Sequence, residues 1–193
     1  MTSLNGATVL VTGANGGIGT EFVRQALVRG AAKVYASARH PRAWGDDRIV
    51  PLTLDVTDPA SIQAAAESAA DVTVLINNAG ASPASASLLT LPEEDIRSIM
   101  ETNFFGPLNL ARAFAPVLKG QEAAAMVNIH SLLSWYATAG VYSVSKAASG
   151  RQRMPSGSSL PRRASRSSAC TSDGWIPPWP PTRLTPSFRR QSW

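Results

Sequence analysis

The stretch Thr12-Gly13-Ala14-Asn15-Gly16-Gly17-Ile18-Gly19 lies between an apolar run at residues 9–11 and a helical pattern at residues 17–29. An apolar run, a glycine-rich turn and a helix in this order predict a buried strand followed by a helix. The free N–H groups at such a helix N-terminus can bind a pyrophosphate, because glycines leave its approach open. An NTPase phosphate loop is disfavoured, since no Gly-Lys-Ser/Thr follows the turn.

The three spaced glycines each suit a physical requirement of such a turn. Gly13 would allow the tight turn, Gly17 the close approach of the pyrophosphate, and Gly19 the close packing of helix on strand. The turn is expected to bind a dinucleotide through Gly13, Asn15, Gly17, Ile18 and Gly19. A turn with a purely structural role is the alternative interpretation.

Outward from the turn, apolar runs and helical patterns alternate along the chain. We expect further strands at 33–37, 49–54, 72–76 and 125–129, and helices at 59–69, from 91 onward and from 142 onward. Strands that alternate with helices indicate βαβ units. The sequence therefore predicts an α/β fold: a Rossmann-like, doubly wound parallel sheet, truncated after the fifth strand and the start of the helix at 142–148.

Charge and composition change abruptly near Ala148. Residues 1–148 contain 10 Lys+Arg and 12 Asp+Glu, whereas residues 149–193 contain 8 Arg and a single acid, Asp173. The second segment also contains 10 serines and 7 of the 14 prolines. We therefore divide the chain into an incomplete dinucleotide-binding domain, 1–148, and a basic Pro/Ser/Arg-rich tail, 149–193, which we expect to be disordered.

The residues after the second expected strand bear on the choice between NAD and NADP. An acid at this place would bind the ribose 2′-hydroxyl and repel a 2′-phosphate. The segment here is Ser37-Ala38-Arg39, with one arginine and no acid. Because a guanidinium matches a phosphate, Arg39 favours NADP over NAD. A solvated loop arginine is the alternative.

Further motifs follow in order along the chain: Leu54-Asp55-Val56, Asn77-Asn78-Ala79-Gly80, Asn103, Ser131 and Tyr142-Ser143-Val144-Ser145-Lys146. Together with the glycine turn, they make residues 5–148 resemble the short-chain dehydrogenase/reductase family. The resemblance implies an NADP-dependent oxidoreductase that transfers hydride between NADPH and a carbonyl or alcohol.

The resemblance also implies catalytic roles for four residues. Tyr142 would be the general acid or base; a free phenol is a weak base at neutral pH, and the positive charge of Lys146, one helical turn on, favours its ionised form. Lys146 would also hold the nicotinamide ribose. Ser131 would bind the substrate oxygen, and Asn103 would hold a water in a proton relay to Lys146.

The remaining implied contacts concern the adenosine and the ribose. Asp55 would meet the adenine amine, Val56 the adenine ring region, and Asn78, Ala79 and Gly80 the ribose. We assign no metal ligand.

Three nearby side chains compete for these roles. Ser134 is a second serine near the site, but Ser131 directly follows the strand and is preferred. His130 is interpreted as a packed loop histidine and receives no role. Tyr136 is excluded as the catalytic tyrosine, because no lysine lies four residues on.

Residues 149–193 do not resemble the corresponding segment of the family, and we interpret the difference as a frameshift in the gene. If the gene lost one base near codon 148, each original codon begins one base before the present one. Trp175-Ile176 then requires GAT, which encodes Asp, and Trp179-Pro180 requires GCC, which encodes Ala. With permitted choices elsewhere the segment can read Gly-Trp-Val-Asp-Thr-Ala-Met-Ala, similar to the family's segment after its sixth strand.

The rival interpretation of the tail is a basic arm for nucleic acid or an acidic membrane. We disfavour it, because the tail has no lysine, no basic helix face and no binding motif.

We expect no nucleic-acid partner and no membrane span, and we expect a cytoplasmic location, in keeping with the single Cys170. A small carbonyl or alcohol is the expected partner, and a homo-oligomer is possible for the intact family fold. A catalytically inactive dinucleotide-binding fragment, or a non-functional frameshift product, is the alternative to an active enzyme.

Overall fold

The computed structural model describes residues 4–83, 87–136 and 138–152 of the 193-residue chain. Its strands are β1 (Thr8–Thr12), β2 (Lys33–Ala38), β3 (Ile49–Thr53), β4 (Val74–Asn77) and β5 (Ala125–Asn128). Its α-helices are α1 (Gly17–Val28), α2 (Pro59–Ser68), α3 (Glu93–Met100), α4 (Gly106–Lys119) and α5 (Gly140–Gly150). A π-helical turn, Glu101–Phe105, joins α3 to α4, and a 3-10 turn, Leu132–Ser134, precedes α5.

The strands form one parallel sheet in the order β3-β2-β1-β4-β5. The register pairs Val9 of β1 with Val34 of β2 on one side and with Val74 of β4 on the other. The strand order reverses between β1 and β4, and the carboxyl ends of parallel strands at such a switch point are where open α/β sheets bind ligands. The Rossmann-like doubly wound fold expected from the sequence is confirmed.

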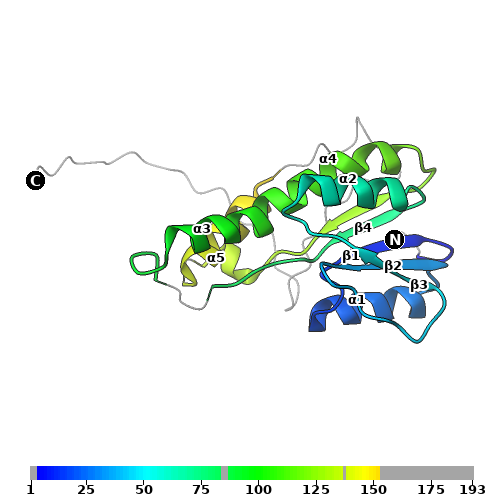
Figure 1. Cartoon of the computed structure of the whole chain (residues 1–193), viewed down its shortest axis with the longest axis horizontal. Coiled ribbons are helices and arrows are strands. Elements are labelled where there is room, and N and C mark those ends of the chain that lie inside the picture. Colours follow the sequence, from blue (N-terminus) through cyan, green and yellow to red (C-terminus); the bar gives the residue numbers. More distant parts are fainter. Residues whose placement is uncertain (1–3, 84–86, 137, 153–193) are drawn as a thin grey trace, which may run out of the picture.

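Helices cover both faces of the sheet, and each face has its own apolar core (Figure 1). On one face α2 and α4 pack against the strands, with Phe114 and Leu110 of α4 fully buried. On the other face α1 packs Val23 and Ala26 against β1 and β2. The first strand is buried from both sides, which explains its uninterrupted apolar run.

Element boundaries lie within two residues of the sequence expectations at every end that the sequence predicts. The strand expected at 72–76 runs from Val74 to Asn77, and the helix expected from 142 begins at Gly140. Pro51 lies inside β3, which is an edge strand of the described sheet, and edge strands are where a proline is tolerated.

The long helix expected from residue 91 is interrupted, and this corrects the sequence interpretation. Its first segment, α3, carries three acids in its first turn, as expected, but the chain then widens into the π-helical turn. Pro107 has no N–H, so the ordinary helical hydrogen bond to the Asn103 carbonyl cannot form. The loosened turn contains Asn103, one of the expected catalytic residues.

Helix α5 continues two residues beyond Ala148, to Gly150. Most of the expected tail, 153–193, lies outside the described residues. The expectation that the tail is disordered concerns these residues and stays a prediction. None of the helices in the described ranges has the length and apolar character needed to cross a membrane.

Candidate active site

The glycine turn has the backbone geometry that its spacing predicts. Gly13 has a φ of +66°, and a Cβ there would lie 3.0 Å from the Ala79 Cα. A Cβ on Gly19 would lie 2.1 Å from the Gly13 carbonyl oxygen and 2.9 Å from the Asn78 Nδ2. Gly17, at the start of α1, has no atom within 4 Å of its Cβ position. A side chain at Gly13 or Gly19 would therefore collide with the protein. The space beside Gly17 is free for a ligand, as a pyrophosphate site requires.

These contacts predict different outcomes for two neighbouring glycine-to-alanine changes. Gly19→Ala has no room for its methyl group, and we expect it to destabilise the fold by roughly 1–3 kcal/mol or more. Gly17→Ala is the matched control, and we expect it to keep the thermal unfolding temperature but to weaken dinucleotide binding. Thermal unfolding and cofactor titration of both variants test this pair. Equal unfolding temperatures for the two would contradict the packing role of Gly19.

Thr12 and Asn78 tie the glycine turn to the end of β4. The Asn78 and Ala79 N–H groups each donate to the Thr12 Oγ1 at 2.9 Å. The Asn78 Nδ2 donates back to the Thr12 carbonyl at 2.8 Å. The side-chain amide of Asn78 therefore has a structural role that the sequence did not predict, and it holds Ala79 and Gly80 against the turn.

The expected adenosine-binding residues lie around the ends of β2 and β3. The Asp55 carboxylate accepts hydrogen bonds from the Thr57 N–H at 2.9 Å and from the Thr57 hydroxyl at 2.7 Å. These bonds, and then the charge of Arg39, lower the pKa of Asp55 from its ordinary value. Arg39 is exposed. The side chain of Val56 is buried against Gly106, where a Cβ would lie 3.2 Å from the Val56 Cγ2.

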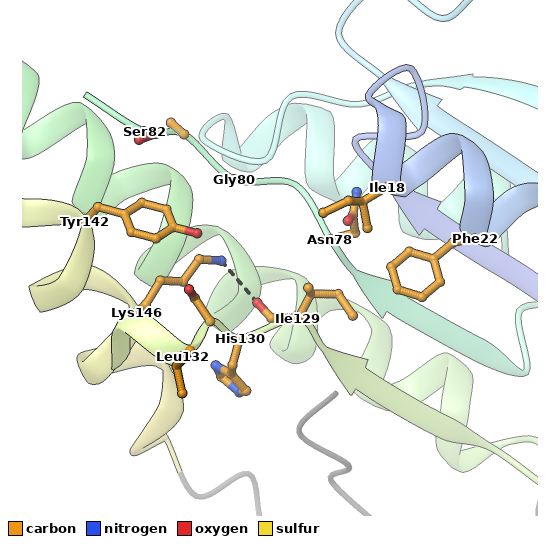
Figure 2. Close-up of a pocket in the computed structure, with 12 residues that line it drawn as sticks. Ile18, Phe22, Asn78, Gly80, Ser82, Ile129, His130, Leu132, Tyr142 and Lys146 are labelled. Atoms are coloured by element: carbon orange, nitrogen blue, oxygen red, sulfur yellow. Dashed lines mark hydrogen bonds between the residues drawn. The ribbon is translucent and has the colours of Figure 1, made fainter. Parts of the chain in front are cut away.

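The expected catalytic pair stands on α5 and faces a cleft of about 630 Å³. Figure 2 shows the Tyr142 hydroxyl and the Lys146 ammonium directed into the space beside Gly80. The Lys146 Nζ lies 5.8 Å from the centre of the Tyr142 ring and donates to the Ile129 carbonyl at 3.1 Å. The Tyr142 hydroxyl has no hydrogen-bond partner among the described residues, so it is available to a ligand in the cleft.

Among the described residues, Lys146 is the one charged side chain that is buried, with 6% of its surface exposed. Burial lowers its pKa from the ordinary lysine value, because desolvation disfavours the charged form. A Cβ on Gly80 would lie 3.6 Å from the Lys146 Nζ, so the glycine keeps this side of the ammonium open.

Asn103 links three segments of the site through its side chain. Its Oδ1 accepts from the Ala81 N–H at 2.8 Å, and its Nδ2 donates to the Ala81 carbonyl at 2.9 Å. The same Nδ2 donates to the Ser145 Oγ at 2.9 Å, and Ser145 is fully buried in α5. The side chain of Asn103 is therefore occupied by protein contacts. A water held by Asn103, as the resemblance implies, would find both N–H groups of the side-chain amide already engaged.

Ser131 and His130 line the same cleft, and Ser134 does not. The Ser131 Oγ accepts from the Leu133 N–H at 3.2 Å, and the Ser134 Oγ instead donates to the Ser131 carbonyl at 2.6 Å. Figure 2 shows the His130 ring turned away from Tyr142. Burial, and then the charge of Lys146, lower the pKa of His130. Ser131 therefore lies in the cleft wall, and so does His130, whose place there was not predicted.

The cleft brings Ile18 of the glycine turn and the expected catalytic pair to the same edge of the sheet. Ile18 from α1, Asn78 and Gly80 from the segment after β4, and Tyr142 and Lys146 from α5 line it together. Within the described ranges, no three histidine, cysteine, aspartate or glutamate side chains gather as a metal site would require.

The family model for short chain dehydrogenases matches residues 7–151. The chain belongs to the short-chain dehydrogenase family. This is a family of oxidoreductases, and the matched range contains every site residue expected from the sequence. The family resemblance inferred from the motifs is confirmed.

Solved and curated relatives agree with this short-chain dehydrogenase assignment. A short-chain dehydrogenase from Burkholderia cenocepacia, solved in complex with NADP, is 38% identical with a TM-score of 0.71; the match covers 78% of this chain and 64% of that one. A second, from Burkholderia phymatum in complex with NAD, is 30% identical with a TM-score of 0.68, over 77% and 58% of the two chains. The NADP-dependent 3-hydroxy acid dehydrogenase of Schizosaccharomyces pombe is 32% identical, over 68% of this chain and 56% of that protein.

This short-chain dehydrogenase spans about half the length of the curated relatives that it matches. The matched half contains the glycine turn, the cleft and the α5 pair.

Proposed function

We propose that the chain is an NADP-dependent short-chain oxidoreductase that transfers hydride between NADPH and a small carbonyl or alcohol substrate. The observation that carries this proposal is the place of Tyr142 and Lys146, on successive turns of α5, in a cleft that also reaches the glycine turn. The proton donor, Tyr142, and the dinucleotide-binding turn would then face the same cleft.

The residues around the cleft fit a dinucleotide. The open side of Gly17 and the N–H groups at the start of α1 suit the pyrophosphate. Asp55 and Val56 would meet the adenine, and Ala79 and Gly80 the ribose that Lys146 also reaches. The bound cofactor would supply or accept the hydride.

The protein groups would handle the proton at the substrate oxygen. Ser131 would hydrogen-bond that oxygen, and the Tyr142 hydroxyl would donate a proton as a carbonyl is reduced or take one as an alcohol is oxidised. Lys146, buried one turn further along α5, would hold the nicotinamide ribose beside the Tyr142 hydroxyl. Asn103 and Ser145 would keep α5 in place against the segment after β4.

The choice of NADP over NAD rests on the end of β2. Structural neighbours of this chain were solved with NADP and with NAD, so likeness alone does not decide between them. Arg39 is exposed near Asp55, forms no ion pair with a carboxylate of the described residues, and offers a planar guanidinium to a 2′-phosphate. No acid replaces it at this end of β2.

Arg39→Asp should reverse the cofactor preference. A bidentate arginine–phosphate contact contributes about 1.5–3 kcal/mol, which corresponds to roughly a 10- to 150-fold difference in affinity. We expect the parent chain to bind NADPH more tightly than NADH, and the variant to bind NADH more tightly than NADPH, because an acid at this place repels the 2′-phosphate. Calorimetric titration with both cofactors tests it. Equal affinities of the parent chain for NADPH and NADH would remove the case for NADP.

The alternative is a catalytically inactive dinucleotide-binding fragment, or a non-functional frameshift product. The observation that favours it is the composition break near Ala148, after which residues 149–193 carry eight arginines and one acid. Such a fragment would bind NADPH without turning over any carbonyl. The cytoplasmic location and the homo-oligomer expected from the sequence stay predictions.

A further inference from the structure

The loop after β2 is fastened to the first turns of α1 at two points. The Asn15 Nδ2 donates to the His40 carbonyl at 2.8 Å. The Arg42 Nη2 donates to the Thr20 Oγ1 at 3.1 Å, and the Thr20 hydroxyl in turn donates to the Ala14 carbonyl at 3.0 Å. The loop that carries Arg39 is thus held against the glycine turn, and Arg42 provides one of the two fastenings.

The guanidinium of Arg42 is also fixed by an aromatic ring. Its Cζ lies 4.1 Å from the centre of the Trp44 ring, and Trp44 packs against the core on the α1 face of the sheet. The Trp44 Nε1 is buried and has no hydrogen-bond partner in the described part of the chain. The indole therefore contributes its ring face rather than its N–H, and the stack orders a side chain that would otherwise lose rotamer entropy on binding.

No carboxylate of the described residues forms an ion pair with Arg42. The ion pairs among the described residues use other cations, and in this loop Asp46 is paired with Arg48 at 2.7 Å. Arg42 is exposed, and among the described residues only one of its nitrogens donates to an acceptor. An ordered guanidinium with free donors and no counter-charge is suited to an anionic ligand.

We propose that Arg42 is a second specificity-determining residue for NADP, which binds the 2′-phosphate of the adenosine ribose together with Arg39. The juxtaposition of the loop with the glycine turn places Arg42 beside the N-terminal end of α1, where the dinucleotide ribose is expected. This inference rests on the proposed function. In this proposal two arginines bind the same phosphate. Thr20 and Trp44 hold Arg42 in place, and they do not hold Arg39.

The test uses small fragments of the cofactor, so it needs no turnover. Calorimetry of the full chain would compare adenosine 2′,5′-bisphosphate with adenosine 5′-monophosphate. Arg42→Met keeps an apolar stem on Trp44 but removes the charge, and we expect it to weaken bisphosphate binding about tenfold or more while monophosphate binding is unchanged. Thr20→Val should weaken bisphosphate binding in the same selective way, because the guanidinium loses its anchor. Arg48→Met, an exposed arginine paired with Asp46, is the matched control and should change neither affinity.

The outcomes separate this inference from the proposed function. If the parent chain binds both fragments equally, the NADP preference itself fails. If the parent prefers the bisphosphate and Arg42→Met binds it as tightly, the role of Arg42 is overturned and the proposed function stands. A parallel loss of both fragments in Arg42→Met, with thermal unfolding unchanged, would show a loop-shaping residue and would also overturn the inference.

Discussion

Restoring the neighbouring reading frame after Ala148 is expected to raise carbonyl reduction at least about 100-fold over the chain as it stands. A displacement of about 1 Å in a catalytic group can cost about this factor, and catalytic side chains must be held to about half an ångström by the structure around them. Tyr142 and Lys146 stand on α5, which ends at Gly150 among the described residues. The composition of 149–193 offers no apolar pattern to support that helix. We therefore expect little or no turnover from the present chain, measured as NADPH oxidation over a panel of carbonyl compounds.

Sequencing the coding DNA is the control for this expectation. We predict that the neighbouring frame continues α5, then encodes two strands and an Asp-Thr-Ala-Met-Ala segment behind Trp175–Pro181. A stop in that frame within a few codons of residue 149 would contradict the frameshift account. The basic tail would then need an explanation of its own.

Tyr142→Phe should lower kcat of the frame-restored protein by about 100- to 10,000-fold, the usual contribution of a positioned general acid or base. The change removes one hydroxyl at the cleft and leaves the ring and its place on α5. The hydroxyl has no protein hydrogen bond among the described residues, so the fold loses little. NADPH affinity and the thermal unfolding temperature should stay close to those of the parent.

The matched control is Tyr136→Phe, which removes a hydroxyl from an exposed tyrosine that does not line the cleft. It should leave kcat unchanged. If Tyr142→Phe keeps most of the activity, the proton must come from another group, and the assignment of Tyr142 is wrong.

The sequence predicts most of the fold because its signals are local. The glycine turn, the apolar runs and the helix patterns each occupy a few consecutive residues, and their order along the chain determines the parallel sheet. The π-helical turn was missed, although Pro107, four residues after Asn103, carries a signal for it. A proline inside a helical pattern marks a disturbed turn even where the helix does not end.

The contacts that support the site could not be predicted, because they join residues far apart in sequence. Ser145 and Asn103 are 42 residues apart, and Arg42 and Thr20 are 22 apart. The Lys146 bond to the Ile129 carbonyl depends on how α5 packs across the end of β5. Residue types and spacing gave the candidate catalytic residues, but the tertiary packing determines what each side chain contacts.

The most direct test of the central claim is NADPH oxidation by the frame-restored protein with a panel of small aldehydes and ketones. We predict that NADPH is consumed with at least one carbonyl, that NADH is a poorer donor, and that Tyr142→Phe stops the reaction. A folded, frame-restored protein that binds NADPH but reduces none of the carbonyls would contradict the proposed oxidoreductase and would favour a dinucleotide-binding protein without catalysis.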